Sequence, residues 1–351
     1  MFEGPLRDWD GEEVVVRFDA STGAWMFVGV HSTVLGPAMG GTRLKVYASP
    51  DDALVDVLRL SAAMTFKQAA ADLPYGGAKA VIAVPAVPAP QERGELLRRY
   101  GRLVDSLHGT YVTAADMNTN QTDMDVIGEV TSHVLGRSRE AGGSGDPAPG
   151  TAVGVFHGIV ASARHAFGSG DLADVRVLVQ GVGSVGGRLI GLLRDAGARV
   201  LVSDVDEVRA GEAAASVDGS VVAPGDVIGT ECDVYAPCAT GAVLDSESIP
   251  ALRCPVVAGA ANNQLATAED AGRLRAAGVL YAPDYVINAG GVIHLAGYER
   301  FGWDEAAVAA RLAGIGQTLT DVFESADLEG ITTAEAADRL AQERLATEPR
   351  D

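Results

Sequence analysis

At 351 residues, the chain exceeds the roughly 250–300 residues at which a single hydrophobic core stops growing, so two domains are expected. It is 47% hydrophobic and 21% charged, which is ordinary for globular proteins, and its net charge of -20 disfavours nucleic acid or anionic membranes as partners. No apolar run reaches the roughly 18–20 residues of a membrane span, and the N-terminus does not resemble a signal peptide, so we expect a cytoplasmic protein.

The chain has three cysteines, Cys232, Cys238 and Cys254. Their number does not support a disulfide framework, and their spacing does not match a zinc site. We interpret them as core thiols in a reducing compartment and expect no bound metal.

The first part of the chain predicts a domain of strands and helices. Residues 13–18 and 25–31 are rich in β-branched and aromatic residues and flank a turn, which predicts a hairpin. The segment PAMGGTR at 37–43 is expected to be irregular because of its adjacent glycines. A helix is expected to begin at Ser49-Pro50 and to continue at helical spacing toward Met64.

Three more elements are predicted before the chain changes character. A Pro-Tyr-Gly-Gly turn at 74–77 comes before Lys79 and an apolar strand at 80–84. A helix at 92–107 and a strand at 109–115 follow, and that strand leads into Asp116.

Residues 142–149 (GGSGDPAP) are the best candidate for a linker between domains. Short apolar strands then alternate with helices, which predicts a parallel sheet of βαβ units; the strands are expected at 175–180, 200–204, 233–236, 256–258 and 279–282. We therefore expect an α/β protein of two domains separated by a cleft. Its parts would be an N-terminal α/β substrate-binding and oligomerisation domain (1–145), a nucleotide-binding domain (146–290) and a helical segment packing back across the cleft (291–351).

Gly181, Gly183 and Gly186 form a GxGxxG pattern between an apolar strand and a predicted helix. The first glycine permits the turn, the second lets a pyrophosphate approach the backbone, and the third lets helix and strand pack closely, as in Rossmann-type dinucleotide-binding domains. Asp204, at the end of the next strand, would accept hydrogen bonds from the ribose hydroxyls and repel a 2′-phosphate. The pattern predicts NAD in preference to NADP; the alternative is a glycine-rich turn that binds nothing.

Only three of the 27 basic residues are lysines, and two of them, Lys67 and Lys79, lie close in sequence. Arginine stays protonated, whereas a lysine amine can lose its proton when it is buried. With Asp116 nearby, one ammonium could pair with a substrate carboxylate, the other lysine could act as a general base, and the aspartate could shuttle a proton. Gly40 and Gly41 could add backbone amides for the carboxylate. The alternative is two surface lysines and an aspartate that caps a helix.

Several segments together resemble the glutamate/leucine/phenylalanine/valine dehydrogenase family, most nearly its phenylalanine branch. In the first domain they are PAMGGTR (37–43), MTFK (64–67), LPYGGAK (73–79) and TAAD (113–116). In the second they are TAVGV (151–155), the glycine fingerprint, AGAANNQL (258–265) and PDYVINAGG (283–291). The resemblance runs in order from about residue 25 to 300 and implies an NAD-dependent enzyme that interconverts an L-amino acid with a 2-oxo acid and ammonium.

The resemblance also implies roles for individual residues. Lys79 would be the base that activates water, and Asp116 would exchange a proton with the amino group. Substrate contacts are expected from Gly40, Gly41, Met64, Lys67, Ala114, Asn120, Asn262, Asn288, Val292 and Leu295. Cofactor contacts are expected from Thr151, Gly181, Gly183, Ser184, Val185, Gly186, Asp204, Ala239 and Asn262, with the adjacent Asn263 as an alternative to Asn262.

The substrate side chain is expected to be apolar. A glutamate side chain would need a further cation, and the remaining lysine, Lys45, is expected to be exposed. The small Ala114 leaves room for a ring, and the stretch DMNTN at 116–120 resembles the phenylalanine branch more than the leucine branch. Asn118 departs from the glycine that is frequent there in the family. We therefore predict reversible oxidative deamination of L-phenylalanine by a homo-oligomer, with leucine or valine as alternative substrates.

Two other classes of protein were considered. A dinucleotide-sensing protein without catalysis would be expected to lack Lys79 or Asp116, and both are present. A 2-hydroxy-acid dehydrogenase would need a histidine base near the nicotinamide, and only His294 lies in a suitable segment. The two dehydrogenase reactions differ in whether they require ammonium.

Overall fold

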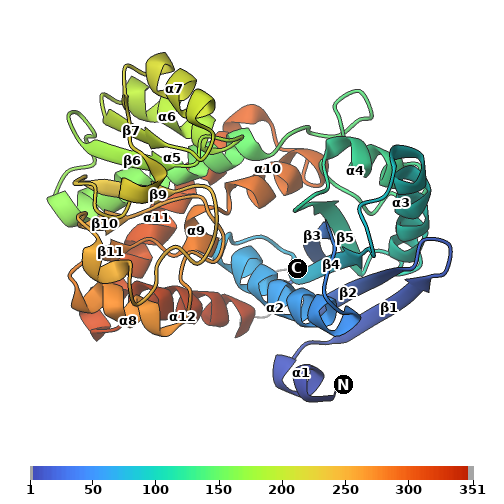
Figure 1. Cartoon of the computed structure of the whole chain (residues 1–351). Coiled ribbons are helices and arrows are strands. Elements are labelled where there is room, and N and C mark those ends of the chain that lie inside the picture. Colours follow the sequence, from blue (N-terminus) through green and yellow to red (C-terminus); the bar gives the residue numbers. More distant parts are fainter. Residues whose placement is uncertain (1–2, 347–351) are drawn as a thin grey trace. The chain divides into compact units, whose positions relative to one another are not determined.

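The computed structural model describes residues 3–346 and divides into two compact units (Figure 1). Unit 1 contains the described residues up to Asp146, Leu295–Gly302, and those from Ala341 onward. Unit 2 contains Pro147–His294 and Trp303–Leu340. The stretch predicted as one C-terminal segment is thus shared between both units, and its residues 347–351 lie outside the described part.

Unit 1 is built on a mixed five-stranded sheet with the order β1-β2-β4-β3-β5. Its strands are β1 (Glu13–Asp19), β2 (Ala24–Ser32), β3 (Ala38–Lys45), β4 (Gly76–Ala83) and β5 (Tyr111–Ala115). β1 and β2 form the predicted hairpin, and β4 runs antiparallel to β2. β3 lies between β4 and β5 and runs parallel to both.

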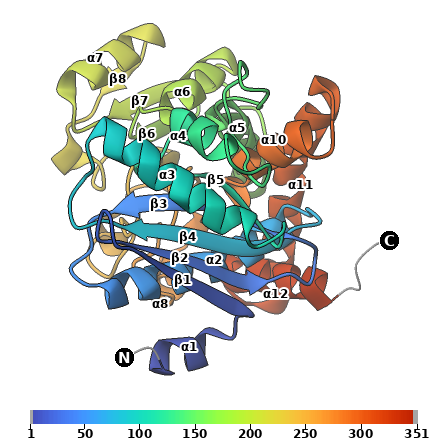
Figure 2. The same cartoon turned by 90° about the vertical axis from the view of Figure 1, so that its right-hand side faces the viewer.

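Helices cover the two faces of this sheet (Figure 2). The helices of unit 1 include α1 (Glu3–Trp9), α2 (Pro50–Ala70), α3 (Pro90–Asp105) and α4 (Gln121–Gly128). Leucines of α3 pack with Ala78, Ala80 and Ile82 on one face, whereas α2 packs with Phe27 and Val81 on the other. The side chain of Ser49 accepts a hydrogen bond from the Asp52 amide, so α2 begins where the sequence predicts.

The expectation that residues 37–43 are irregular was wrong, because they lie largely in β3. β4 likewise begins at Gly76, so Lys79 lies inside a fully buried strand rather than just before one. The glycines permit close approach of backbones here: a Cβ on Gly40 would lie 1.6 Å from the carbonyl oxygen of Ala78. A Cβ on Gly77 would lie 2.0 Å from the amide nitrogen of Thr65 in α2. These glycines therefore serve packing rather than turns.

Unit 2 contains a six-stranded parallel sheet with the order β11-β10-β9-β6-β7-β8, which confirms the predicted α/β alternation. The strands are β6 (Arg176–Gln180), β7 (Arg199–Ser203), β8 (Ser220–Val221), β9 (Val234–Pro237), β10 (Val256–Val257) and β11 (Leu280–Tyr281). The chain leaves β6 toward β7 on one side and later returns to β9 on the other. The end of β6 is thus a topological switch point, where open α/β sheets bind ligands.

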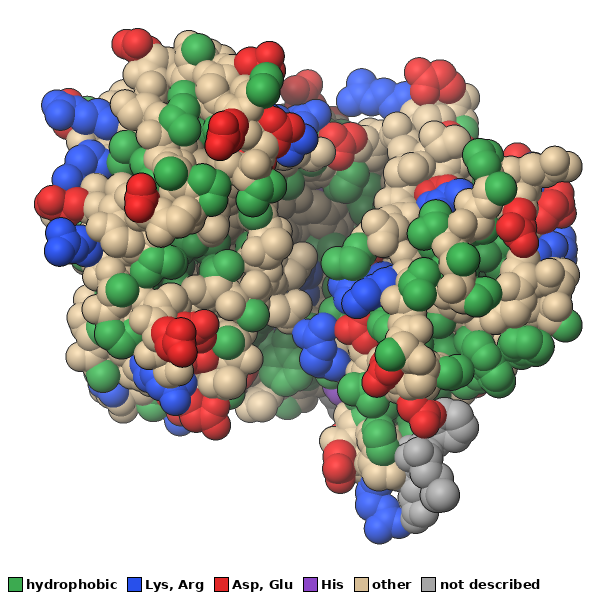
Figure 3. All heavy atoms as spheres, in the orientation of Figure 1, with side chains coloured by type: hydrophobic (Ala, Val, Ile, Leu, Met, Phe, Trp, Pro, Cys, Tyr) green, Lys and Arg blue, Asp and Glu red, His purple; other side chains and the backbone are tan. Residues whose placement is uncertain are grey.

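The remaining helices follow in chain order. They are α5 (Ala148–Phe167), α6 (Gly186–Asp195), α7 (Glu207–Ser216), α8 (Glu269–Ala276), α9 (Asp284–Ile287), α10 (Gly290–Glu299), α11 (Glu305–Glu329) and α12 (Thr333–Ala346). Within residues 3–346, no helix is long and apolar enough to cross a membrane. Cys232 and Cys254 are buried in the core of unit 2, and Cys238 is partly exposed. Acidic and basic side chains are interspersed on the face drawn in Figure 3.

The packing of β3 against β4 makes a direct prediction. Gly40→Ala would force a methyl group into the backbone of β4, and it should destabilise the protein by at least about 3 kcal/mol or prevent folding. Gly191→Ala is the matched control, because a Cβ there meets nothing within 4 Å on α6 and should be neutral or stabilising by up to about 1 kcal/mol. Urea unfolding followed by circular dichroism measures both, and equal stability of the two variants would contradict the packing argument.

Candidate active site

The register of three parallel strands brings Lys79, Arg43 and Asp116 to one face of the unit 1 sheet. Thr42 of β3 pairs with Ala80 of β4 and with Ala115 of β5. Paired residues of neighbouring strands lie on the same face of a sheet, and side chains alternate between the two faces along each strand. The residues that come directly before or after Thr42, Ala80 and Ala115 therefore share the other face. Gly41, Lys79 and Arg43 therefore point toward α2, and Asp116 follows directly from the end of β5.

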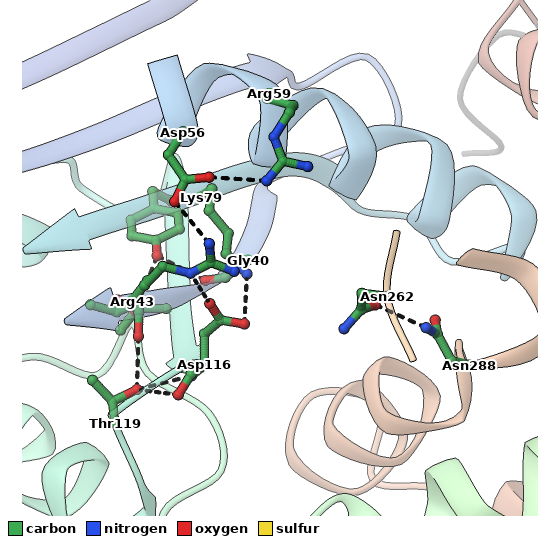
Figure 4. A network of polar contacts seen from close by, with 12 residues as sticks. Gly40, Arg43, Asp56, Arg59, Lys79, Asp116, Thr119, Asn262 and Asn288 are labelled. Atoms are coloured by element: carbon green, nitrogen blue, oxygen red, sulfur yellow. Dashed lines mark hydrogen bonds and ion pairs between the residues drawn. The ribbon is translucent and has the colours of Figure 1, made fainter. Parts of the chain in front are cut away.

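Asp116 is held by two cations (Figure 4). Its Oδ1 lies 3.0 Å from Lys79 Nζ, and its Oδ2 lies 3.0 Å from Arg43 Nε. The Lys79 side chain is 8% exposed and that of Asp116 is 22% exposed, so the pair is largely removed from water. Burial acts to raise the pKa of Asp116, but the charges of Lys79 and Arg43 outweigh it and lower the pKa to about 2. Asp116 is thus ionised near neutral pH.

The loop after β5 fixes the backbone of Asp116. Its amide donates to Thr119 Oγ1 at 2.9 Å, and that hydroxyl donates to the Thr42 carbonyl at 2.7 Å. Asn118 has a φ of +59°, and its side-chain amide donates to the Leu44 carbonyl at 3.1 Å. A positive φ suits glycine best and asparagine next, so Asn118 fits a position where the resemblance leads us to expect glycine.

Arg43 and Asp56 belong to this site but were missed by the sequence reasoning. Arg43 Nη1 donates to Asp56 Oδ2 at 2.8 Å, and Tyr47 donates its hydroxyl to the same oxygen at 2.6 Å. Burial acts to raise the pKa of Asp56, but hydrogen bonding from Tyr47 and the charge of Arg43 lower it overall. The sequence signal that could have found Arg43 is its position at the end of PAMGGTR. That segment forms most of β3, which pairs with the strand that carries Lys79.

The other predicted substrate residues of unit 1 lie on α2, β5 and α10 and at the start of α4. Met64 is buried and Lys67 partly buried in the C-terminal half of α2, and Gly77 of β4 packs against that stretch at Thr65. Ala114 is buried on β5, and Leu295 is buried on α10. Asn120 has a structural role, because its Oδ1 accepts a hydrogen bond from the Asp123 amide at 3.1 Å and caps α4.

In unit 2, the glycine fingerprint has the geometry that the sequence predicts. Gly181 has a φ of +92°, and a Cβ on Gly186 would lie 1.9 Å from the Gly181 carbonyl oxygen. A Cβ on Gly183 would meet nothing within 4 Å, so its backbone faces open space. Ser184 and Val185 complete the turn into α6, and the side chain of Ala239 lies against Gly181. The loop after β6 thus leaves room for a phosphate beside the start of a helix.

Asp204 follows β7 and faces the same loop. Its Oδ2 accepts the Val182 amide at 2.9 Å, and its Oδ1 accepts the Asp206 amide at 3.0 Å. Burial acts to raise its pKa, but these backbone hydrogen bonds, with help from the charge of Arg209, lower it overall. The carboxylate is therefore charged, as the recognition of ribose hydroxyls requires.

Asn288 carries a buried polar atom without a partner. Its Nδ2 donates to Asn262 Oδ1 at 2.8 Å (Figure 4). The same Nδ2 donates to the Ala260 carbonyl at 3.1 Å. Its Oδ1 is buried and accepts no hydrogen bond from any residue in the described part of the chain. A buried acceptor without a donor is destabilising unless a ligand satisfies it. An N–H group of a bound nicotinamide or substrate would do so.

The remaining predicted residues of unit 2 lie on α5, on α10 and in the loop that precedes α8. Thr151 of α5 donates its hydroxyl to the Pro147 carbonyl at 3.3 Å, and a Cβ on Gly291 would lie 2.8 Å from that hydroxyl. Val292 is partly buried on α10, and Asn263 has a φ of +52°. Together with the open Gly183, Asp204 and the unpartnered oxygen of Asn288, these features fit a dinucleotide. Residues 3–346 contain no group of three or more His, Cys, Asp or Glu that could hold a metal ion.

Comparison with known proteins agrees with this chemistry. Residues 15–133 match the model "Glu/Leu/Phe/Val dehydrogenase, dimerisation domain", and residues 203–351 match "Glutamate/Leucine/Phenylalanine/Valine dehydrogenase". The chain is 43% identical over 342 residues to a leucine dehydrogenase of Bacillus cereus, which covers 97% of this chain and 93% of that protein. It is 40% identical over 339 residues to a phenylalanine dehydrogenase of Bacillus thermotolerans, covering 95% and 88%.

A solved structure gives the same result. The crystal structure of L-tryptophan dehydrogenase from Nostoc punctiforme matches with a TM-score of 0.84 and 39% identity, covering 98% of each chain. The fold and the comparisons define a pyridine-nucleotide-dependent amino acid dehydrogenase. The chain belongs to the glutamate/leucine/phenylalanine/valine dehydrogenase family.

Proposed function

We propose that the chain catalyses the reversible NAD-dependent oxidative deamination of L-phenylalanine to phenylpyruvate and ammonium. The observation that carries the reaction type is the Lys79–Asp116 pair, with Nζ and Oδ1 3.0 Å apart on a largely buried face. A base and a proton carrier in contact, removed from water, are what amine–carbonyl interconversion requires.

The residues of the chain divide the work as follows. Lys67 binds the substrate carboxylate. A nicotinamide bound in unit 2 would supply the acceptor for the hydride of the substrate Cα. Lys79 first passes a proton to Asp116 across their 3.0 Å contact and, as the neutral amine, removes a proton from the water that attacks the imine carbon. Asp116 then gives the proton it received to the departing amine, so that 2-oxo acid and ammonium leave and the ion pair is restored.

The substrate side chain is proposed to be apolar and aromatic. Ala114, near Asp116, is small, and two relatives of about 40% identity are named phenylalanine and tryptophan dehydrogenases. L-leucine is the second candidate, because the 43% identical relative is a leucine dehydrogenase. Apolar pockets separate such side chains by only about 1–3 kcal/mol, so a strong preference rather than exclusive use is expected.

The proposal includes a homo-oligomer built through unit 1. The matching N-terminal family model is described as a dimerisation domain. β1 is an edge strand of the sheet, and its Val16 and Phe18 are 45% and 50% exposed. Apolar side chains on an exposed edge strand are suited to association with a second copy.

Oxidation of NADH tests the proposed reaction. Phenylpyruvate, 4-methyl-2-oxopentanoate and indole-3-pyruvate are each supplied with and without ammonium, and absorbance at about 340 nm is followed. We expect turnover only with ammonium, with the largest kcat/KM for phenylpyruvate. A larger kcat/KM for 4-methyl-2-oxopentanoate would favour leucine as the substrate, and turnover without ammonium would exclude amino acid dehydrogenation.

Lys79→Ala tests the base. It should lower kcat by roughly 10²–10⁴-fold while NADH affinity, measured by fluorescence titration, stays within about threefold. Lys45→Ala is the control, because Lys45 is an exposed lysine on the same sheet that lies 4.9 Å from the centre of the Tyr47 ring. If Lys79→Ala turned over as fast as Lys45→Ala, Lys79 would not be the base.

Asp204→Asn tests the choice of cofactor. The amide keeps an acceptor for the Val182 amide but removes the charge that would repel a 2′-phosphate. The ratio of kcat/KM for NAD over NADP should fall about 10-fold or more. Asp206→Asn, which still allows capping of α7, should leave the ratio unchanged, and an unchanged ratio in both variants would remove Asp204 from the role.

A further inference from the structure

Five side chains of alternating charge form a continuous series behind the Lys79–Asp116 pair. Asp56 lies 3.0 Å from Arg59 through Oδ1 and 2.8 Å from Arg43 through Oδ2. Arg43 and Lys79 then each lie 3.0 Å from a different oxygen of Asp116. The series runs from the exposed Arg59 on α2, through β3, to the buried Lys79 on β4 (Figure 4).

Two carboxylates, those of Asp116 and Asp56, hold the Arg43 guanidinium in place. Its side chain is 13% exposed, and its guanidinium uses Nε for Asp116 and Nη1 for Asp56. A planar guanidinium bonded to two carboxylates at different nitrogens cannot rotate without breaking one bond. Tyr47 also donates to Asp56, so the carboxylate behind Arg43 is itself held in place.

We infer that Arg43 is a positioning residue: braced by Asp56 and Tyr47, it fixes the Asp116 carboxylate with one oxygen toward Lys79 for proton transfer. The inference rests on the proposed function, because it concerns the proton that Asp116 carries. Arg43 acts through Asp116 and not on the substrate. Its loss should therefore lower kcat more than it changes KM for the 2-oxo acid.

The charge of Arg43 also bears on when Asp116 takes up a proton. The charged and titratable groups near Asp116 are Lys79 from β4, Arg43 from β3, Asp56 and Arg59 from α2 behind Arg43, and Tyr111 from β5. Burial acts to raise the pKa of Asp116, while Lys79 and Arg43 lower it. Removing the Arg43 charge should raise that pKa, but from a value of about 2 the carboxylate would still be ionised near neutral pH. The expected effect is therefore on kcat and not on the position of an acid limb.

The test compares four variants with the wild-type enzyme in the ammonium-dependent assay, and both kcat and KM for the 2-oxo acid are measured. Arg43→Gln removes the positive charge and the planar set of donors of the guanidinium. Arg43→Lys keeps the charge and removes only that planar set of donors. Asp56→Ala removes the brace and leaves Arg43 in place. Arg99→Gln is the control: Arg99 also pairs with an aspartate, Asp19 at 2.9 Å, and its side chain is 27% exposed, but it lies outside the site.

Arg43→Gln is expected to lower kcat about 10–100-fold while KM for the 2-oxo acid stays within about threefold. Arg43→Lys should also lower kcat with KM nearly unchanged, which covers the case in which Arg43→Gln does not fold. Asp56→Ala should lower kcat without raising KM, and Arg99→Gln should keep the wild-type kcat and KM even if it unfolds at lower temperature.

The outcomes separate two failures. Wild-type enzyme without ammonium-dependent turnover would overturn the proposed function, and the inference with it. Active wild-type enzyme, with both Arg43 variants matching Arg99→Gln in kcat and KM, would overturn the inference alone. A rise in KM with unchanged kcat would also overturn it, because that result would place Arg43 in substrate binding.

Discussion

An ammonium and a carboxylate that are both largely withdrawn from water place the strongest constraint on unit 1. Removing each charge from water costs several kcal/mol, which only close and well-oriented partners can offset. Lys79 and Asp116 meet this condition at 3.0 Å because parallel strands set their level and Arg43 holds the second carboxylate oxygen. Gly40 and Gly41 serve the same end, since a Cβ on Gly41 would lie 2.9 Å from Asp116 Cβ. The close packing of this sheet is therefore also what brings the charged groups of the site together.

The candidate site of unit 2 is built differently, because it consists mainly of backbone groups beside open space and of polar side-chain atoms that a ligand could contact. The loop after β6 lies where the strand order reverses, and Gly183 has open space beside it. Asp204 is charged and anchored by the Val182 amide, so it does not depend on a ligand for its position. Asn288 is held through its nitrogen while its oxygen accepts nothing among the described residues. Such a site is preorganised for a polar ligand.

Periodicity and turn residues were enough to predict the hairpin, α2 and the alternating strands of unit 2, because these features depend on neighbours in sequence. The GxGxxG turn and the position of Asp204 after β7 were predictable for the same reason. The strand at 38–45 was missed because adjacent glycines usually indicate a turn, and only the contact with Ala78 explains them. The Arg43–Asp56 pair depends on the packing of α2 on the sheet. Local sequence patterns carry no information on such long-range contacts. For the same reason, they did not predict that the stretch from residue 291 onward is divided between the two units.

The measurement that tests the central claim most directly follows the nitrogen atom. Phenylpyruvate, NADH and ¹⁵N-ammonium are incubated with the enzyme, and the products are identified by NMR and chiral chromatography. If Lys79 and Asp116 support amine–carbonyl interconversion, ¹⁵N-labelled L-phenylalanine should form in equal amount to the NADH consumed. Unlabelled 2-hydroxy acid formed in equal amount to NADH would contradict the account, because carbonyl reduction needs neither ammonium nor the proton transfer assigned to Asp116.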